Sequence, residues 1–339
     1  MDFAARSLPA RPKGTAMHSH PSDVSPPSHD RAPSALPEPA GGLLALVGNT
    51  PLIQLSRITA HLNPAVRVLA KAEWFNPGGS VKDRPASAIL QQALESGMLG
   101  GGRVLLDSTS GNMGIAYATL GSSLGIPVCL AIPANASPER LAILRAHGVE
   151  LYLTDPTEGT DGARLVAAEF AARAPAHYYF ADQYSNPANW QAHFRTTGPE
   201  IVRQTQAQVT HFIAGLGTTG TMTGAGRFLR QSVPSVRLIA IQPDGPLHGL
   251  DGLKHLPSAR LPEIFDPSIP DETITVDTES AYAMARRLAR TEGLLVGVSA
   301  AAAADAALRV AERLESGTVV VIFPDSGLKY LGSSFWSAA

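Results

Sequence analysis

The chain is constrained most strongly by short apolar segments that alternate, from residue 103 onward, with longer segments of helical periodicity. The apolar segments are rich in valine, isoleucine and leucine, as are strands that a sheet buries on both faces. Strands that alternate with helices pair in parallel and leave helices on both faces of an open sheet. The sequence therefore predicts an α/β fold whose ligands bind at the carboxyl ends of the strands. The predicted strands are residues 103–107, 127–132, 149–153, 210–216, 236–242 and 318–323.

Two of the predicted helices begin at residues that are typical of N-caps. Ser137 precedes Pro-Glu and a helical pattern, and Asp277 precedes a second pattern that ends at Gly293. Short polar side chains accept hydrogen bonds from the free N–H groups of a first turn, and glycine tolerates the left-handed backbone that ends a helix. Residues 256–272 are rich in proline, so we expect an irregular segment there.

Composition limits the classes of function. With 339 residues, 44% of them hydrophobic and 17% charged, the chain resembles a soluble globular protein of one large or two modest domains. A net charge of −2 gives no footprint for nucleic acid or an anionic membrane surface, and no apolar run reaches the roughly 20 residues of a membrane helix. The single cysteine, Cys129, excludes an intrachain disulfide and a thiolate metal cluster. We therefore expect a buried thiol and a reducing, cytoplasmic location.

The N-terminal segment differs from the rest of the chain. Eight of the 27 prolines fall within the first forty residues, where large apolar side chains are few. Such a segment buries little surface, so residues 1–42 are predicted to be a disordered tail, without the apolar core of a secretory signal. His18, His20 and His29 lack ordered partners there, and we predict no metal site. Met17 is an alternative start of the protein.

A lysine follows a glycine-rich turn in the stretch NPGGSVKDR, residues 76–84. In one interpretation Lys82 is a solvated charge at the start of a helix. In the other it holds an aldehyde cofactor as a Schiff base, which a lysine presented from a rigid turn into a cleft can do. The second interpretation requires a phosphate site, a carboxylate site and a partner for a ring nitrogen elsewhere in the chain.

A phosphate site is predicted where the strand 210–216 runs into a turn of small residues. Backbone N–H groups at such a turn converge on an anion, the dipole of the following helix favours negative charge, and threonine hydroxyls add donors. A purely structural turn is the alternative for a glycine-rich loop of this kind. The turn lacks the Gly-Lys-Ser/Thr of a Walker loop. Its residues are Gly217, Thr218, Thr219, Gly220 and Thr221.

Two further loops follow predicted strands. Residues 108–114, STSGNMG, place small hydroxyl residues and glycine at the start of a helix, which suits a carboxylate. Asn112 adds an amide for a cofactor ring hydroxyl. After strand 318–323 the chain reads PDSGLKY, and the neutral hydroxyl of Ser326 is the predicted partner of a pyridine nitrogen. Each loop taken alone also fits an ordinary strand-to-helix connection.

Together these stretches resemble the pyridoxal-phosphate-dependent family of cysteine synthases and cystathionine β-synthases, from Leu43 to Leu331. The resemblance implies a fold-type II enzyme with two open parallel-sheet domains, like the tryptophan synthase β-subunit, that forms a homodimer. It also implies a large cofactor-binding domain of residues 43–86 plus 188–335 and a small mobile substrate domain of residues 87–187. The matching stretches are LVGNTPLIQL, KAEWFNPGGSVKDR, DSTSGNMG, DQYSNPANWQAHFRTTGPEI, AGLGTTGTMTG, GVSAAAA and PDSGLKYL.

By position, the resemblance also implies roles for individual residues. Lys82 would be the Schiff-base lysine and proton carrier, and residues 217–221 would hold the phosphate. Asn112 would contact the ring oxygen and Ser326 the ring nitrogen. The implied substrate contacts are Thr109, Ser110, Gly111, Met113, Gln183 and Lys254.

The reaction implied by the resemblance is β-replacement on an activated serine. O-acetylserine or O-phosphoserine would lose its β-substituent to give an α-aminoacrylate intermediate, and sulfide or thiosulfate would add to give cysteine or S-sulfocysteine. Three alternatives remain open: synthesis of another β-substituted alanine such as 2,3-diaminopropionate, a serine or threonine dehydratase, and a non-catalytic relative that binds an amino acid or a partner enzyme.

Some positions bear on the substrate. The segment after strand 236–242 resembles that of B-type, thiosulfate-tolerant cysteine synthases, and Lys254 and His255 stand where two basic residues would attract an anionic nucleophile or leaving group. A surface lysine and a capping histidine are the alternative. Met113 stands where the family usually has threonine, and Ala300 and Ala301 replace a usual Ser-Gly pair. The chain ends eight residues after Leu331, which argues against a C-terminal regulatory domain.

Overall fold

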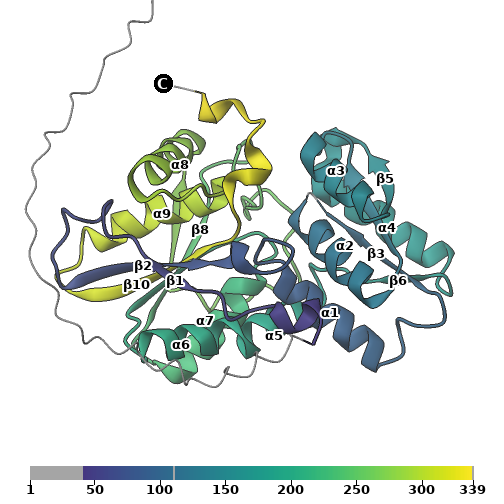
Figure 1. Ribbon diagram of the computed structural model, residues 1–339, viewed down its shortest axis with the longest axis horizontal. Coiled ribbons are helices and arrows are strands. Elements are labelled where there is room, and N and C mark those ends of the chain that lie inside the picture. The colour runs from purple at the N-terminus through teal and green to yellow at the C-terminus, as the bar shows by residue number, and fades with distance from the viewer. Residues whose placement is uncertain (1–40, 110, 338–339) are drawn as a thin grey trace, which may run out of the picture. The chain divides into compact units, whose positions relative to one another are not determined.

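The computed structural model describes residues 41–109 and 111–337 (Figure 1). Nearly all of the predicted tail, residues 1–42, lies outside the described residues. The described part belongs to one compact unit that contains two sheets. Among its helices, none is both long and apolar enough to cross a membrane.

The larger sheet has six strands in the order β1-β2-β10-β7-β8-β9. All neighbours pair in parallel except β1, which pairs antiparallel with β2. Successive side chains of the central strand β10 point to opposite faces, as a strand requires. Its strands are β1 (Leu52–Gln54), β2 (Val66–Ala72), β7 (His211–Gly215), β8 (Arg237–Pro243), β9 (Glu272–Val276) and β10 (Gly317–Phe323).

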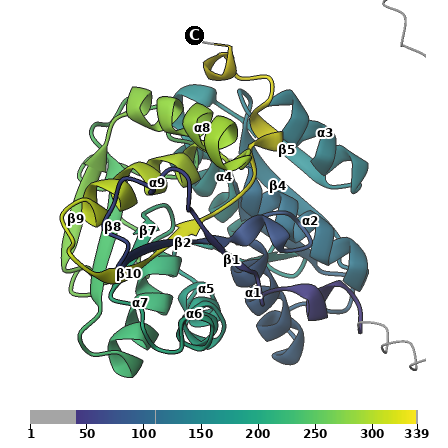
Figure 2. The same ribbon diagram turned by 60° about the vertical axis from the view of Figure 1, so that its left-hand side comes forward.

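Helices cover both faces of this sheet (Figures 1 and 2). On one face, Val319 and Val321 of β10 pack with the alanine-rich helix α9 and with α8. On the other, Val320 and Ile322 pack with residues of α6 and α7, and α5 packs on α7. These helices are α5 (Ala188–Arg195), α6 (Thr197–Thr205), α7 (Gly220–Ser232), α8 (Thr278–Glu292) and α9 (Val298–Ala311).

The smaller sheet has four parallel strands in the order β5-β4-β3-β6. Leu105 of β3 packs in a core with α1, α2 and α3, whereas Leu106 packs on the opposite side with α4. The elements of this part are β3 (Val104–Ser108), β4 (Val128–Pro133), β5 (Glu150–Thr154), β6 (Tyr178–Phe180), α1 (Asp83–Glu95), α2 (Asn112–Leu124), α3 (Pro138–Ala146) and α4 (Gly159–Arg173). Short 3-10 turns η1 (Leu43–Leu46), η2 (Glu73–Phe75), η3 (Pro156–Glu158), η4 (Gly327–Tyr330) and η5 (Ser334–Trp336) complete the chain.

The structure confirms the α/β class and all the predicted strands, each to within one residue at either end. Asp277 accepts a hydrogen bond from the Ser280 N–H at 2.8 Å and caps α8, which ends at a left-handed Gly293. Ser137 caps α3. Cys129 is buried, and burial raises the pKa of its thiol to about 11.

The sequence patterns missed β1, β2, β6 and β9. Strand β2 reads VRVLAKA, in which charged residues interrupt the apolar run. The four-stranded sheet lies within the predicted small domain, residues 87–187, but the division into a large and a small mobile domain stays a prediction.

A buried cluster of charges joins α1, β2 and α6. The guanidinium of Arg84 contacts Glu73 at 2.6 Å and Glu200 at 2.7 Å, and Lys71 donates to Glu200 at 2.6 Å. All of these side chains are buried. Because Arg84 lies in the first turn of α1, the cluster fixes the place where this helix starts, one residue after Lys82.

We expect Arg84→Leu to lower the free energy of unfolding by about 3–5 kcal/mol, because it leaves Glu73 buried without its cationic partner and Glu200 with Lys71 alone. Urea denaturation measures the change. The matched control is Arg173→Leu, whose side chain pairs with Glu169 on the exposed surface of α4 and should leave stability unchanged within error. Equal stability of the Arg84 variant and wild type would contradict the account.

The same cluster predicts a loss of stability in acid. Burial by itself raises the pKa of Glu200, but the hydrogen bonds and charge of Arg84, followed by Lys71, outweigh burial and lower the pKa from 4.5 to about 2. A lowered pKa in the folded state stabilises it above the unfolded value, so this contribution is lost as pH falls from 4.5 towards 2. Glu200→Gln should be less stable than wild type at neutral pH and lose less stability across this window in urea titrations. An equally steep acid limb in both proteins would refute this.

Candidate active site

Lys82 is presented from a turn that its own neighbours hold rigid. The carboxylate of Asp83 accepts from the backbone N–H of Gly78 at 3.1 Å and of Ser80 at 3.0 Å. A Cβ at Gly78 would lie 2.2 Å from this carboxylate, so the turn requires glycine there. The Val81 N–H donates to the carbonyl of Pro324 at 2.8 Å, which joins the turn to the end of β10.

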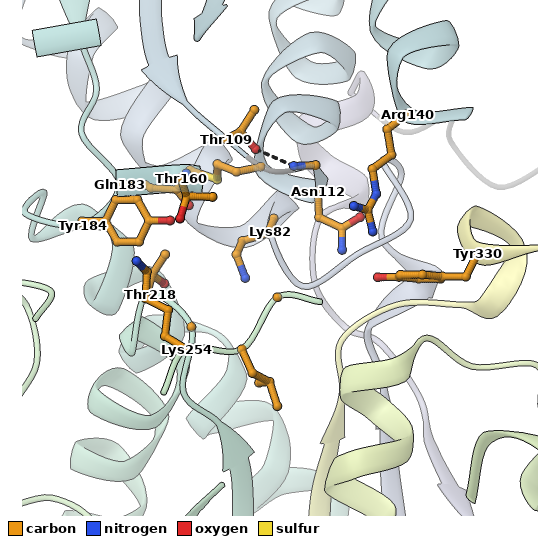
Figure 3. A pocket seen from close by; sticks show the side chains of 15 residues that line it. Lys82, Thr109, Asn112, Arg140, Thr160, Gln183, Tyr184, Thr218, Lys254 and Tyr330 are labelled. Atoms are coloured by element: carbon orange, nitrogen blue, oxygen red, sulfur yellow. Dashed lines mark hydrogen bonds between the residues drawn. The ribbon is translucent and has the colours of Figure 1, made fainter. Parts of the chain in front are cut away.

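The side chain of Lys82 projects into a pocket between the two sheets' loops (Figure 3). Within the described part of the chain, its Nζ has no hydrogen-bond partner. Burial lowers the pKa of this amine, and the negative charge of Asp325 acts in the opposite direction. The pocket is lined by Lys82, Thr109, Gly111, Asn112, Met113, Arg140, Thr160, Gln183, Tyr184, Gly217, Thr218, Gly252, Leu253, Lys254 and Tyr330.

The predicted phosphate loop connects β7 to α7 and adjoins Lys82. A Cβ at Gly217 would lie 2.3 Å from the carbonyl oxygen of Gly252, and one at Gly220 would lie 2.0 Å from Oδ1 of Asn189. Thr219, the N-cap of α7, adopts a left-handed backbone with φ of 70°. Its buried hydroxyl has no partner among the described residues. A helix N-terminus with an unused hydroxyl donor fits a phosphate group.

The other hydroxyls of this loop have partners. Thr218 Oγ1 accepts from the side-chain amide of Asn189 at 3.2 Å. Thr221 Oγ1 lies 3.2 Å from Nε2 of His193, and burial lowers the pKa of this histidine well below its ordinary value. The loop therefore presents oriented hydroxyls beside a neutral imidazole.

The predicted carboxylate loop lies across the pocket from the phosphate loop. Thr109 Oγ1 accepts from the backbone N–H of Gly111 at 3.0 Å and of Gly114 at 3.1 Å, so this hydroxyl also shapes the loop. Met113 lines the pocket while most of its side chain is buried. Gln183 donates to the carbonyl of Ser108 at 2.7 Å. The predicted contact Ser110 lies outside the described residues.

Asn112 is the first residue of α2 and lines the pocket beside Lys82. Its Nδ2 donates to Oδ2 of Asp325 at 2.8 Å, and its Oδ1 accepts from Nζ of Lys329 at 2.8 Å. The amide therefore links the small-sheet loop to the segment that follows β10.

The structure does not bring Ser326 to this pocket. Ser326 forms an isolated bridge with Val296 and lines a separate cavity with Trp74 and Leu328. The reason is local geometry: Asp325 precedes Ser326 in an extended segment and is wholly buried, so Ser326 faces the other way. Ser299, in the first turn of α9, lines a cavity together with Lys82, Asn112, Thr218, Thr219 and Thr221. A hydroxyl at a helix start in GVSAAAA was the signal available in the sequence.

Of the two predicted basic residues, only Lys254 reaches the pocket. Its Nζ pairs with Asp161 at 2.7 Å and lies 5.0 Å from the centre of the Tyr184 ring. His255 bonds to Ser258 instead and is not among the residues that line the Lys82 pocket. Ala300 and Ala301 are fully buried in the core around α9, so they act on packing rather than on the pocket wall.

The sequence analysis did not predict several residues that line the pocket, and Arg140 is the charged residue among them. Arg140, in the first turn of α3, pairs with Asp251 at 2.9 Å and lies over the ring of Tyr330 at 5.1 Å. The Ser137 cap was the only local signal, because Asp251 and Tyr330 are more than a hundred residues away in sequence.

The pocket thus combines a lysine amine that has no partner among the described residues, a phosphate loop and a loop for a carboxylate. Its charged lining residues, Lys82, Arg140 and Lys254, are all cationic. Anionic ligands are therefore favoured at this site.

Comparison with known proteins agrees with this geometry. The family model described as pyridoxal-phosphate dependent enzyme matches residues 43–325. A cysteine synthase of Aquifex aeolicus is 49% identical over 300 residues, which cover 87% of this chain and 92% of the relative. Cysteine synthase B of Escherichia coli is 40% identical over 287 residues, 85% of this chain and 93% of the relative.

Solved structures give the same result. The crystal structure of O-acetylserine sulfhydrylase isoform 3 from Entamoeba histolytica matches with a TM-score of 0.84 and 32% sequence identity, over 90% of this chain and 94% of the other. The fold type that the sequence motifs implied is confirmed. The chain belongs to the pyridoxal-phosphate-dependent enzymes, and within them to the cysteine synthases.

Proposed function

We propose that the protein replaces the β-substituent of O-acetylserine or O-phosphoserine with sulfide or thiosulfate, giving cysteine or S-sulfocysteine. One observation carries the proposal: the Lys82 amine, with its pKa lowered by burial, lies between the phosphate loop and the carboxylate loop of a single pocket. A family member that only binds amino acids has no need of such a lysine.

Residues around Lys82 would hold the cofactor. Gly217 through Thr221 bind the phosphate at the start of α7, and Asn112 contacts the ring oxygen. Ser299 takes the role that the sequence had given to Ser326, because its neutral hydroxyl lies in the cavity with Lys82. When bound, pyridoxal phosphate supplies an electron sink for negative charge at the substrate Cα.

Lys82 moves the proton of the reaction. A primary amine with a lowered pKa has a larger neutral fraction at physiological pH, so it can accept the Cα proton. It returns the proton to Cα after the new bond at Cβ has formed. Because Nζ is not engaged by other side chains of the described residues, the amine is free to change position between these steps.

The loop after β3 binds and orients the amino acid. Backbone N–H groups near the start of α2, with Thr109 and Gln183, bind the substrate carboxylate. Met113 adds an apolar surface that helps to exclude water from the reacting carbons. Movement of the small sheet, which we propose from the family, would open and close this site, and the Arg140–Asp251 and Lys254–Asp161 pairs join the two sides when it is closed.

Lys254 and Arg140 favour an anionic β-substituent and an anionic nucleophile. An anionic β-substituent such as phosphate, or an anionic nucleophile such as thiosulfate, gains from two cationic side chains in a pocket that no carboxylate of the described residues lines. Arg140 is already paired with Asp251 and Lys254 with Asp161, and these negative charges reduce the preference for anions.

The proposal is tested by absorbance titration of the holoenzyme. Addition of O-acetylserine or O-phosphoserine should change the visible band of the bound cofactor, and sulfide or thiosulfate should restore it while cysteine or S-sulfocysteine appears. The pairing that works names the substrates. Release of pyruvate without a sulfur product would indicate a dehydratase, and full turnover by Lys82→Ala would refute the proposal.

We expect Gly217→Ala to weaken cofactor binding at least about tenfold, because its Cβ meets the backbone of Gly252 rather than a flexible side chain. The matched control is Gly245→Ala, whose Cβ would meet open space. Equilibrium binding of the cofactor by fluorescence measures both. Equal affinities in the two variants would contradict the assignment of the loop.

The assignment of the ring-nitrogen contact to Ser299 instead of Ser326 leads to a separate prediction. Ser299→Ala should shift the visible spectrum of the bound cofactor and reduce turnover, because it removes the partner proposed for the ring nitrogen. Ser326→Ala removes a hydroxyl of the same kind from the neighbouring cavity and should leave the spectrum unchanged. The reverse result would restore the role to Ser326.

A further inference from the structure

The side chain of Asn112 is held between an acid and a base that both follow β10. Asp325 Oδ2 accepts from its Nδ2, and Lys329 Nζ donates to its Oδ1, both at 2.8 Å. A carboxylate only accepts hydrogen bonds and an ammonium only donates them. The two contacts therefore fix which end of the amide is oxygen and which is nitrogen.

This arrangement leaves one donor of Asn112 for the pocket. The NH₂ group has two hydrogens, and Asp325 takes one of them. Asn112 lines both cavities that contain Lys82. The second N–H is thus available to the cofactor's ring oxygen only while Asp325 and Lys329 hold the amide in this orientation.

Asp325 and Lys329 are themselves fixed in place. Tyr330 donates to Asp325 Oδ2 at 2.9 Å, and Lys329 donates to the carbonyl of Gly79 at 3.2 Å. A Cβ at Gly297 would lie 2.0 Å from Asp325 Oδ1, so a glycine is required where the carboxylate packs against the start of α9.

Burying this carboxylate is costly, which argues for a role beyond packing. Asp325 is wholly buried, and Oδ1 has no partner among the described residues. Burial raises the pKa of Asp325, while Lys329, Asn112 and Tyr330 oppose the rise. Groups with unfavourable burial that sit beside a reactive residue often serve the site.

We infer that Asp325 and Lys329 are a positioning pair that orients Asn112 toward the bound cofactor, an inference that rests on the role proposed for Asn112. The pair acts through Asn112 and does not touch the substrate. The same contacts join the loop that carries Asn112 to the segment after β10.

The test uses Lys329→Met, Lys329→Arg and Asp325→Asn in the holoenzyme, each with and without Asn112→Ala. Loss of one charged hydrogen bond that orients Asn112 should raise the dissociation constant of the cofactor by about tenfold. Lys329→Met should also shift the visible band and lower kcat more than it raises KM. Lys329→Arg keeps a cationic donor and should stay within about threefold of wild type.

The Asn112→Ala background separates positioning from a merely structural role. There, Lys329→Met should change cofactor affinity by less than about twofold, because the residue it orients is gone. Asp305→Asn, a carboxylate paired with Arg309 on α9, is the control for loss of charge and should leave the spectrum unchanged. Because Asp325→Asn can impair folding, Lys329→Met carries the decision.

An undiminished effect of Lys329→Met in the Asn112→Ala background would overturn the inference, and so would an unchanged spectrum and affinity in Lys329→Met itself. A wild-type protein that binds no pyridoxal phosphate would instead overturn the proposed function, and this inference with it.

Discussion

The site depends on the parallel register of β10 between β2 and β7. Phe323 of β10 pairs with Ala72 of β2, and Val321 pairs with Ile213 of β7. Because parallel strands end at the same edge, the segment after β10, the lysine turn after β2 and the phosphate loop after β7 meet there. A slip of two residues would separate Lys82 from Asp325 and from the loop at Gly217.

Buried charge, in addition to apolar packing, holds the lysine turn in place at this edge. Arg84 and its partners anchor the first turn of α1, so the backbone of Lys82 has little freedom. The amine at the end of the side chain, by contrast, has no partner in the described part of the chain. Proton transfer to and from one carbon requires a reactive amine that is free to move and a rigid backbone that holds it near that carbon. The charges buried in the Arg84 cluster thus stabilise the backbone around Lys82, whereas the cationic side chains that line the pocket favour anionic ligands.

Sequence patterns predicted the elements and loops that depend on local chemistry. The strands followed from apolar runs, and Lys82, Thr219 and Asn112 followed from glycine-rich turns at strand ends. The sequence analysis placed Ser326 in the pocket, but side chains along an extended segment alternate between two faces. Asp325 takes the buried position there, so Ser326 points the other way. Arg140 and Tyr330 could not be found in this way, since their contact joins α3 to the far C-terminal turn. The strand β2 was missed because its Lys71 looks solvent-facing until its partner Glu200 is known.

The central claim, that Lys82 carries the cofactor, is tested most directly by reduction of the holoenzyme with borohydride followed by peptide mapping. Reduction makes the bond between a lysine nitrogen and the cofactor's aldehyde carbon permanent, so the labelled residue is identified by mass. The chain offers Lys13, Lys71, Lys254 and Lys329 as alternatives to Lys82. Our account predicts the label on the peptide that contains Lys82 and on no other. A label on one of the other four lysines, or none on any peptide of a holoenzyme that retains its visible band, would contradict it.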